Sequence, residues 1–231
     1  MAKEKKPIIV VDGAEYLRIL CKTKVFEKGD DPGKIAKEVI NDKIQDGDIL
    51  VISSKVVAVS QGRAIPEREI KVGLMARVMW RFVQKVPYGI GLRSPATFQS
   101  AINECGHLKI LLAAIAGVIG KFLGRRGDFY RVAGMQAATI DAAHTCPIKP
   151  YDECVILGPK EPEKVSEDIK NKTGFETAVM DINDIGGSWV LGCTNGIDKG
   201  LLQNIMRDNP MGQKTEQTPI CIVRRLVKKN D

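Results

Sequence analysis

Aromatic side chains are scarce in this sequence. They make up 5% of its 231 residues, as four Tyr, six Phe and two Trp scattered along the chain. Proteins that hold single-stranded nucleic acid stack bases on aromatic side chains set among basic ones. That pattern is missing, and part of the formal net charge of +7 lies at the two ends, as in ordinary solvated tails. We therefore predict no nucleic-acid partner.

Paired cysteines are also missing. The six cysteines include no Cys-x-x-Cys pair, and the first residues do not have the pattern of a signal peptide. We therefore expect reduced thiols in a cytoplasmic protein. Cys105-x-His107 and His144-x-Cys146 offer four soft ligands, but their spacing fits no standard zinc site.

A long uninterrupted apolar run is the third absence. The most apolar stretch, residues 108–123, is broken by Lys109 and Lys121 and is shorter than the roughly 20 residues of a membrane-spanning helix. We predict no stable membrane span and a buried helix here, in which Gly117 and Gly120 allow a neighbour to approach closely. A helix on a membrane surface is the alternative.

What is present is an ordinary globular composition, 44% hydrophobic and 27% charged. No repeat or composition shift marks a linker, so we predict one domain over residues 1–231, with 1–7 disordered. Apolar patterning predicts strands at 8–11, 16–25, 49–52, 56–59, 137–140, 153–157, 177–180 and 218–223, and short apolar runs lie at 129–133 and 189–191. Helices are predicted from Pro32 and at 70–86, 108–123, 162–172 and 201–206. The segment from 153 to 180 then forms a strand, helix, strand unit.

The first candidate site follows the strand at 177–180. Asp181 ends this apolar run, and Asn183, Asp184 and a Gly-Gly pair come next. Carboxylates delivered from a buried strand into a glycine-containing turn are suited to a divalent cation and its phosphates. Asp and Asn after a strand also make ordinary turns, because their side chains bond nearby backbone. Both interpretations stay open.

A second candidate site lies between the strands predicted at 49–52 and 56–59. Ser54 and Lys55 stand there, and Arg63 follows shortly after. A lysine charge suits phosphate, and a serine hydroxyl suits phosphate or metal-bound water. An edge-strand lysine that guards against aggregation is an equal alternative. The run 137–140 ends at Asp141, so two aspartates from different strands could share one cation.

Three segments taken together resemble a known family. They are Gly47 to Val51 with Ser54-Lys55-Val56-Val57 and Gly62-Arg63; Gly134 with Ile140-Asp141; and Met211-Gly212-Gln213 with Glu216 and Thr218-Pro219. In this order they resemble the coenzyme F420-0:L-glutamate ligases, which join glutamate to a deazaflavin cofactor precursor using GTP.

The resemblance implies an α+β fold of mixed sheets with flanking helices, the F420-0:gamma-glutamyl ligase-like fold, as an intertwined homodimer. Nucleotide and metal would occupy a groove between subunits. It implies GTP or another nucleoside triphosphate with Mg²⁺ or Mn²⁺, a small carboxylic-acid acceptor and L-glutamate as substrates, and an acyl phosphate. By the same resemblance Asp141, Asp181 and Gln213 contact metal or phosphate, and Ser54, Lys55 and Arg63 line the nucleotide. Asp141, Asp181 and Lys55 are the predicted catalytic residues.

The sequence departs from the family after both aspartates. Ala142-Ala143-His144 follow Asp141 where the family has Ser-Asn, and Ile182 to Ile185 replace a Thr and a basic residue. Asp184 is a candidate replacement metal ligand. We predict a divergent ligase-like member whose Asp141, Asp181, Asp184 and Gln213 converge. A non-catalytic nucleotide- or metal-binding or regulatory module, and another phosphate-handling enzyme on the same fold, are the alternatives.

Overall fold

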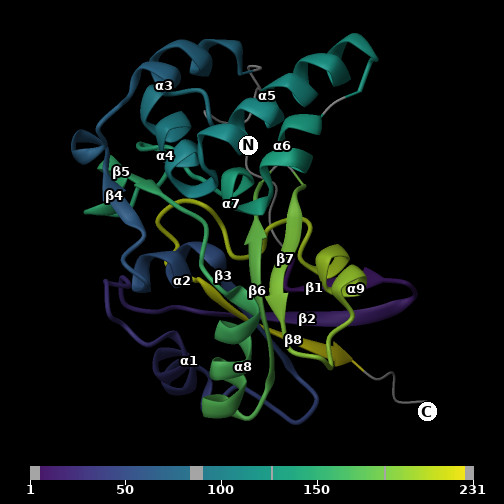
Figure 1. The fold of residues 1–231 in the computed structure, drawn as a ribbon. Helices are drawn as coiled ribbons and strands as arrows, with labels where there is room; N and C mark the ends of the chain where they lie inside the picture. Colours follow the sequence, from purple (N-terminus) through teal and green to yellow (C-terminus); the bar gives the residue numbers. More distant parts are fainter. Residues whose placement is uncertain (1–5, 84–90, 126, 185, 227–231) are drawn as a thin grey trace. The chain divides into compact units, whose positions relative to one another are not determined.

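The computed structural model describes residues 6–83, 91–125, 127–184 and 186–226, and the chain divides into two compact units (Figure 1). Unit 1 comprises residues 1–62 and 160–231, and unit 2 comprises residues 63–159. Unit 2 is therefore an insertion within the chain of unit 1. A single ligase-like domain over residues 1–231 stays a prediction, because compactness does not measure independent folding.

A six-stranded mixed sheet forms the centre of unit 1. Its spatial order is β1-β2-β8-β3-β6-β7. The strands are β1 (Ile8–Val11), β2 (Ala14–Cys21), β3 (Ile49–Ser53), β6 (Glu176–Ile182), β7 (Ser188–Cys193) and β8 (Ile220–Leu226). The β3–β6 pair is parallel, and the other neighbouring pairs are antiparallel. The carboxyl ends of β3 and β6 therefore lie at the same edge of the sheet.

Both faces of this sheet are buried, because successive side chains of a strand point to opposite faces. Leu50 and Ile52 of β3 pack on one face with Val179 of β6. Val51 of β3 packs on the other face with Ala178. This explains why the central strands are continuous apolar runs rather than alternating ones. The mixed α+β class with flanking helices is thus confirmed.

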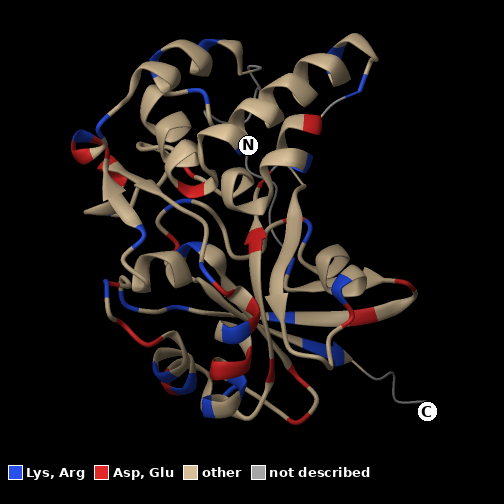
Figure 2. Cartoon of the chain, in the orientation of Figure 1, with Lys and Arg blue, Asp and Glu red and all other residues tan. Residues whose placement is uncertain are grey.

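Helices of unit 1 cover both faces of the sheet. α1 (Pro32–Ile40) and α8 (Pro162–Thr173) pack on the first, and α9 (Lys199–Ile205) packs on the second. Asp31 caps α1 by accepting from the amides of Gly33 and Lys34, and Gly174 ends α8 with a left-handed φ of 86°. These helix ends are as predicted. α8 carries charges of both signs (Figure 2).

Unit 2 is mostly helical. Its described helices are α3 (Leu74–Met79), α4 (Pro95–Cys105), α5 (His107–Phe122), α6 (Asp128–Ala133) and α7 (Met135–Ala138), with short 3-10 turns η1 (Glu67–Glu69), η2 (Trp80–Phe82) and η3 (Tyr151–Glu153). β4 (Ala64–Pro66) and β5 (Cys154–Ile156) form a small antiparallel sheet. Phe98, Ile102, Ile110 and Leu157 are among the residues of a separate core.

Two predicted strands are helical instead. Residues 56–59 belong to α2 (Ser54–Ser60), and 137–140 overlaps α7. The apolar run 129–133 belongs to α6. Lys55 is therefore not an edge-strand lysine. A short apolar run does not distinguish a strand from a buried turn of helix by periodicity, and burial of Val57, Ala58 and Ala133 satisfies the helical alternative.

Other boundaries also differ from the prediction. The helix predicted over 70–86 begins at Leu74 as α3, and residues 84–86 lie outside the described part of the chain. α4 was not predicted. β5 belongs to a different sheet from β6, so the segment from 153 to 180 is not one strand, helix, strand unit. Of residues 1–7, the first five lie outside the described residues.

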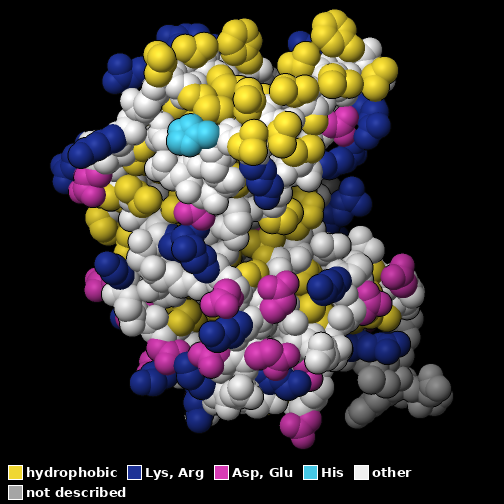
Figure 3. All heavy atoms as spheres, viewed as in Figure 1, with side chains coloured by type: hydrophobic (Ala, Val, Ile, Leu, Met, Phe, Trp, Pro, Cys, Tyr) yellow, Lys and Arg dark blue, Asp and Glu magenta, His cyan; other side chains and the backbone are white. Residues whose placement is uncertain are grey.

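The apolar segment at 108–123 forms a helix, α5, but the prediction that it is buried is wrong. One side of α5 is exposed (Figure 3). A Cβ on Gly117 would lie 3.3 Å from Phe129, and one on Gly120 would clash with Asp128, so the close neighbour is α6, as the glycines predict. No single helix in the described ranges is long and apolar enough to cross a membrane; α4 and α5 reach that size together, bent by 116°.

Candidate functional site

A hydroxyl and a carboxylate meet at the carboxyl ends of β3 and β6. Ser54 begins α2 directly after β3, and its Oγ donates to Oδ1 of Asp181 at 3.4 Å. β6 continues through Asp181, which pairs with Trp189 of β7, to Ile182. The prediction that the strand ends at Asp181 is therefore wrong by one residue. Lys55 follows Ser54 in the first turn of α2 and is partly buried.

The turn after β6 is built by Asn183 and two glycines. The Asn183 amide donates to Gly187 O at 2.9 Å, and the Gly187 amide donates to Asn183 Oδ1 at 2.8 Å. Gly186 has a φ of 88°, and a Cβ on Gly187 would lie 2.3 Å from the Trp189 ring. The ordinary turn interpretation is therefore correct for Asn183.

The loop that precedes β8 meets the same end of β6. Asn209, buried and with a φ of 50°, donates from Nδ2 to Asp184 Oδ1 at 2.8 Å. Gln213 Nε2 donates to the carbonyl of Ile182 at 3.3 Å. Within unit 1 the structure therefore brings Ser54, Asp181, Asp184 and Gln213 to one end of the sheet. Sequence reasoning missed Asn209, which orients Asp184.

Carboxylate, amide and hydroxyl groups make up this end of unit 1. Such hard oxygen donors are the ligands that Mg²⁺ and Mn²⁺ prefer. Among the described residues, no group of three or more His, Cys, Asp or Glu side chains is placed to hold a metal ion. The donor set fits a cation that takes part of its coordination from amide and carbonyl oxygens, water and substrate phosphate.

Asp141 belongs to unit 2. Its amide donates to Ile156 O at 2.8 Å, and its carbonyl accepts from the Ile156 amide at 3.0 Å, in an isolated bridge beside β5. Its convergence with Asp181 stays a prediction, because the two residues lie in different units. His144 is exposed, with Nε2 4.0 Å from Glu67 Oε2.

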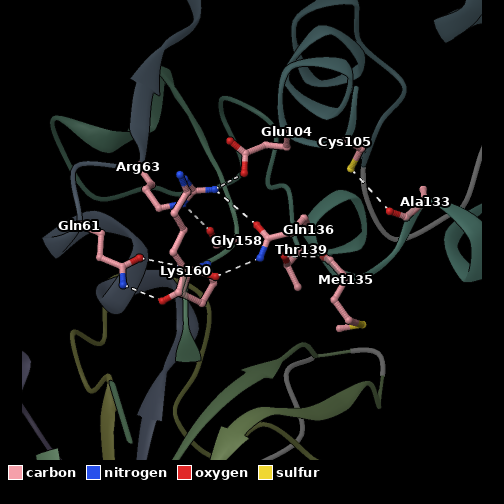
Figure 4. A network of polar contacts seen from close by, with 11 residues as sticks. Gln61, Arg63, Glu104, Cys105, Ala133, Met135, Gln136, Thr139, Gly158 and Lys160 are labelled. Atoms are coloured by element: carbon pink, nitrogen blue, oxygen red, sulfur yellow. Dashed lines mark hydrogen bonds and ion pairs between the residues drawn. The ribbon is translucent and has the colours of Figure 1, made fainter. Parts of the chain in front are cut away.

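Arg63 lies inside a polar network of unit 2 (Figure 4). Its Nε donates to Gly158 O at 2.6 Å, and its Nη2 donates to the carboxylate of Glu104 and to Gln136 Oε1 at 3.5 Å. The arginine is only 8% exposed. Sequence reasoning missed both partners, which lie 41 and 73 positions away. A nucleotide-binding role for Arg63 stays a prediction.

Two hydrogen bonds join Gln61 and Lys160, at the place where the chain leaves unit 1 and returns to it. Gln61 Nε2 donates to Lys160 O at 2.9 Å, and the Lys160 amide donates to Gln61 Oε1 at 2.8 Å (Figure 4). The aliphatic chain of Lys28 lies against Gly62, whose φ is 71°. These contacts hold the two ends of unit 1 together where the insertion begins and ends.

All six cysteines are free in the structure, and their reduced state stays a prediction. Cys105 Sγ donates to Ala133 O at 3.5 Å (Figure 4). Burial raises the pKa of the Cys221 thiol to about 12. Within the described chain the two Cys/His pairs do not form a group of three or more metal-ligating side chains, so the structure gives no support for a zinc site.

Comparison with known proteins gives one result. The family model described as F420-0:Gamma-glutamyl ligase matches residues 21–206, which is most of the chain. A comparison with curated proteins returns no significant match.

Proposed function

The chain belongs to the F420-0:gamma-glutamyl ligase family, and from that premise we propose that it is a nucleotide- and divalent-metal-dependent ligase that forms a γ-glutamyl-type amide bond. The observation that supports the nucleotide site is the meeting of Ser54 with Asp181, beside Lys55 at the start of α2. The Ser54 hydroxyl contacts the Asp181 carboxylate at one edge of the sheet, and Lys55 is the next residue of α2.

Each group of this site has a proposed role. Asp181, Asp184 and Gln213 would hold Mg²⁺ or Mn²⁺, which supplies positive charge against the phosphates of the nucleotide. Lys55 would bind phosphate as a point charge, and the Ser54 hydroxyl would bind phosphate or metal-bound water. Arg63 would contact the nucleotide only if its network with Glu104 opened.

The proposed reaction has two steps. A carboxylate oxygen of the acceptor attacks the γ-phosphorus of GTP, the bond to the β-phosphate oxygen breaks, and GDP leaves. The amine of L-glutamate then attacks the acyl carbon, inorganic phosphate leaves, and the nitrogen loses a proton. Such chemistry asks the protein for positioning and for charge stabilisation, without a protein nucleophile. GTP as the donor, the acyl phosphate and a homodimer with the nucleotide between subunits are parts of this proposal, and the family supports them.

Calorimetric titration of the full chain with GTP and with ATP, each with and without Mg²⁺ or Mn²⁺, tests the nucleotide site. We expect metal-dependent GTP binding that weakens at least tenfold in Asp181→Asn. Asp46→Asn, a change of an exposed aspartate in the loop before β3, is the matched control and should bind as the parent protein does.

Turnover is tested separately. Release of inorganic phosphate that requires both a carboxylic acid and L-glutamate would support the ligase. Failure of both nucleotides to bind would refute it. Binding without phosphate release, across a panel of carboxylic acids, would favour the non-catalytic module.

A further inference from the structure

The outer side of α5 reverses the usual pattern of a surface helix. Exposed apolar side chains recur at helical spacing, at Leu108, Leu112, Ile115, Ile119 and Phe122. Leu108 is 71% exposed and Phe122 is 87% exposed. A helix in a water-soluble protein normally turns such a stripe toward the core, so this side of α5 is suited to an apolar surrounding.

The opposite side of α5 packs in the core of unit 2. Ile110, Ala113 and Gly120 are buried, and the first two belong to the same core as Phe98 of α4. α5 therefore cannot leave unit 2 without exposing that core. A partner of the exposed side must therefore bind while α5 stays packed on unit 2.

A second apolar group lies in the same unit. Leu74 and Val78 of α3 and Phe82 of η2 are exposed, Phe82 at 82%. Figure 3 shows hydrophobic side chains gathered over the part of unit 2 that carries α3 and α5. Contiguous exposed apolar surface of this kind marks an interaction site rather than scattered surface residues. We call these residues, with the stripe of α5, the apolar face.

Basic residues accompany the apolar face. Lys109 and Lys121 of α5 and Arg77 of α3 are exposed, and neither helix has an acidic residue, as Figure 2 shows. Arg81 lies over the Trp80 ring, with 5.1 Å from its Cζ to the ring centroid. The face thus combines apolar side chains with positive charge and interfacial aromatic groups.

The few acidic residues nearby are neutralised internally. Glu104 and Asp128 are the acidic residues of the sequence between Leu74 and Met135. Glu104 pairs with Arg63, and Asp128 pairs with Arg125 and Arg131. Their side chains are 16% and 13% exposed. The segment from Leu74 to Met135, which carries the apolar face, therefore has a net positive charge.

We propose that the apolar face docks the protein on a lipid bilayer that contains anionic lipids, with α5 in the plane of the interface. Charge complementarity favours this occupant: anionic headgroups attract Lys109, Lys121 and Arg77, while the apolar stripe enters the boundary with the acyl chains. A second copy docked on the same face would bring further basic residues, and neither α3 nor α5 has an acidic residue to pair with them, which is unfavourable. The inference does not depend on ligase activity.

Flotation of the full chain with phosphatidylcholine vesicles, with and without phosphatidylglycerol, tests the proposal. We expect binding to the anionic vesicles that weakens when salt is raised. Phe122→Ser should lower the partition coefficient roughly tenfold, because a large apolar side chain is removed from the interface. Val10→Ser, which removes a 62% exposed valine from β1 in unit 1, is the matched control and should bind normally.

Lys121→Gln separates charge from apolar insertion. It should reduce binding to anionic vesicles several-fold and leave binding to neutral vesicles unchanged. Absence of binding to either vesicle would overturn the proposal, as would equal binding of the Phe122→Ser and parent proteins. Equal binding to neutral and anionic vesicles would overturn the choice of anionic lipid. A parent dimer that Phe122→Ser converts to a monomer, without vesicle binding, would assign the face to a second copy.

Discussion

The hydroxyl of Ser54 lies 3.4 Å from the carboxylate of Asp181, although the two residues are 127 positions apart in the chain. The parallel pairing of β3 with β6, in the register Ser53 to Met180, produces this meeting. Open sheets with parallel strands bind ligands beyond the carboxyl ends of those strands. The Ser54–Asp181 contact lies at the edge of the sheet where we propose the nucleotide site.

Ser54→Ala should weaken metal-dependent GTP binding roughly tenfold, because hydrogen bonds to charged groups contribute about 1.5–3 kcal/mol. Thermal stability should change little. Ser60→Ala, at the end of the same helix, removes a hydroxyl that donates to Val57 O and should leave GTP affinity unchanged. Calorimetry of the two variants makes the comparison, and an equal loss in both would argue against a specific role for Ser54.

Arg63→Met should destabilise the protein by about 3 kcal/mol, because it leaves the Glu104 carboxylate without its cation in a site where both side chains are largely buried. Arg63→Met combined with Glu104→Met should recover much of that loss. Urea unfolding measures both variants. Loss of nucleotide affinity at unchanged stability would instead place Arg63 in the nucleotide site.

Asp31 should make stability depend on pH at the acid end. Burial raises the pKa of its carboxyl, but the hydrogen bonds from Lys172 and from the amides of Lys34 and Gly33 outweigh it and lower the pKa below the ordinary value. The stabilisation is then present above about pH 4, the unfolded value, and is lost as the pH falls through the folded pKa.

Asp31→Asn isolates that charge, because asparagine also caps a helix. Its stability should be lower than that of the parent protein at neutral pH, and the difference should disappear as the pH falls through the lowered pKa of Asp31. Urea unfolding across this pH range measures the difference. A constant difference at every pH would show that the carboxylate charge contributes nothing.

Gly192→Ala should be strongly destabilising. A Cβ there would lie 2.2 Å from the Glu163 amide nitrogen and 2.3 Å from the carbonyl carbon of Pro162, and backbone cannot yield as a flexible side chain does. Overpacking of this kind costs about 1–3 kcal/mol or more. Gly200→Ala in α9, where the nearest atom is 3.5 Å away, should stabilise by about 0.5–1 kcal/mol. Thermal denaturation compares them, and similar melting temperatures would contradict the close approach of β7 to α8.

The central sheet and its helices could be predicted from the sequence because their signals are local. Asp31 and Pro32 mark the start of α1, and Gly174 marks the end of α8, by the backbone conformation that each residue permits. The runs that form β3 and β6 are continuous and apolar because both faces of the sheet are covered. For these elements the local preference and the tertiary environment agree.

The predictions from sequence are wrong where tertiary contacts, and not local preferences, determine the structure. Val56 to Val59 has the composition of a strand, yet burial within α2 outweighs that preference. α5 has the composition of a core helix, and which side of it faces solvent depends on α4 and α6. At the site, Asp181 and Gln213 were marked by short motifs. Asn209, Glu104 and Gln136 carried no such signal, because each acts through a partner distant in sequence.

The paired amide groups of Gln61 and Lys160 have a consequence for how this chain can vary. The polypeptide leaves unit 1 and returns to it at one place, and within unit 2 the Leu157 amide donates to Arg63 O at 3.0 Å. In each unit, hydrogen bonds within that unit therefore hold together the two points where the chain passes to the other unit. Lengthening or exchanging the segment 63–159 need not shift the register of β3 against β6. The sequence of one unit can therefore diverge while the Ser54–Asp181 contact of the other is kept.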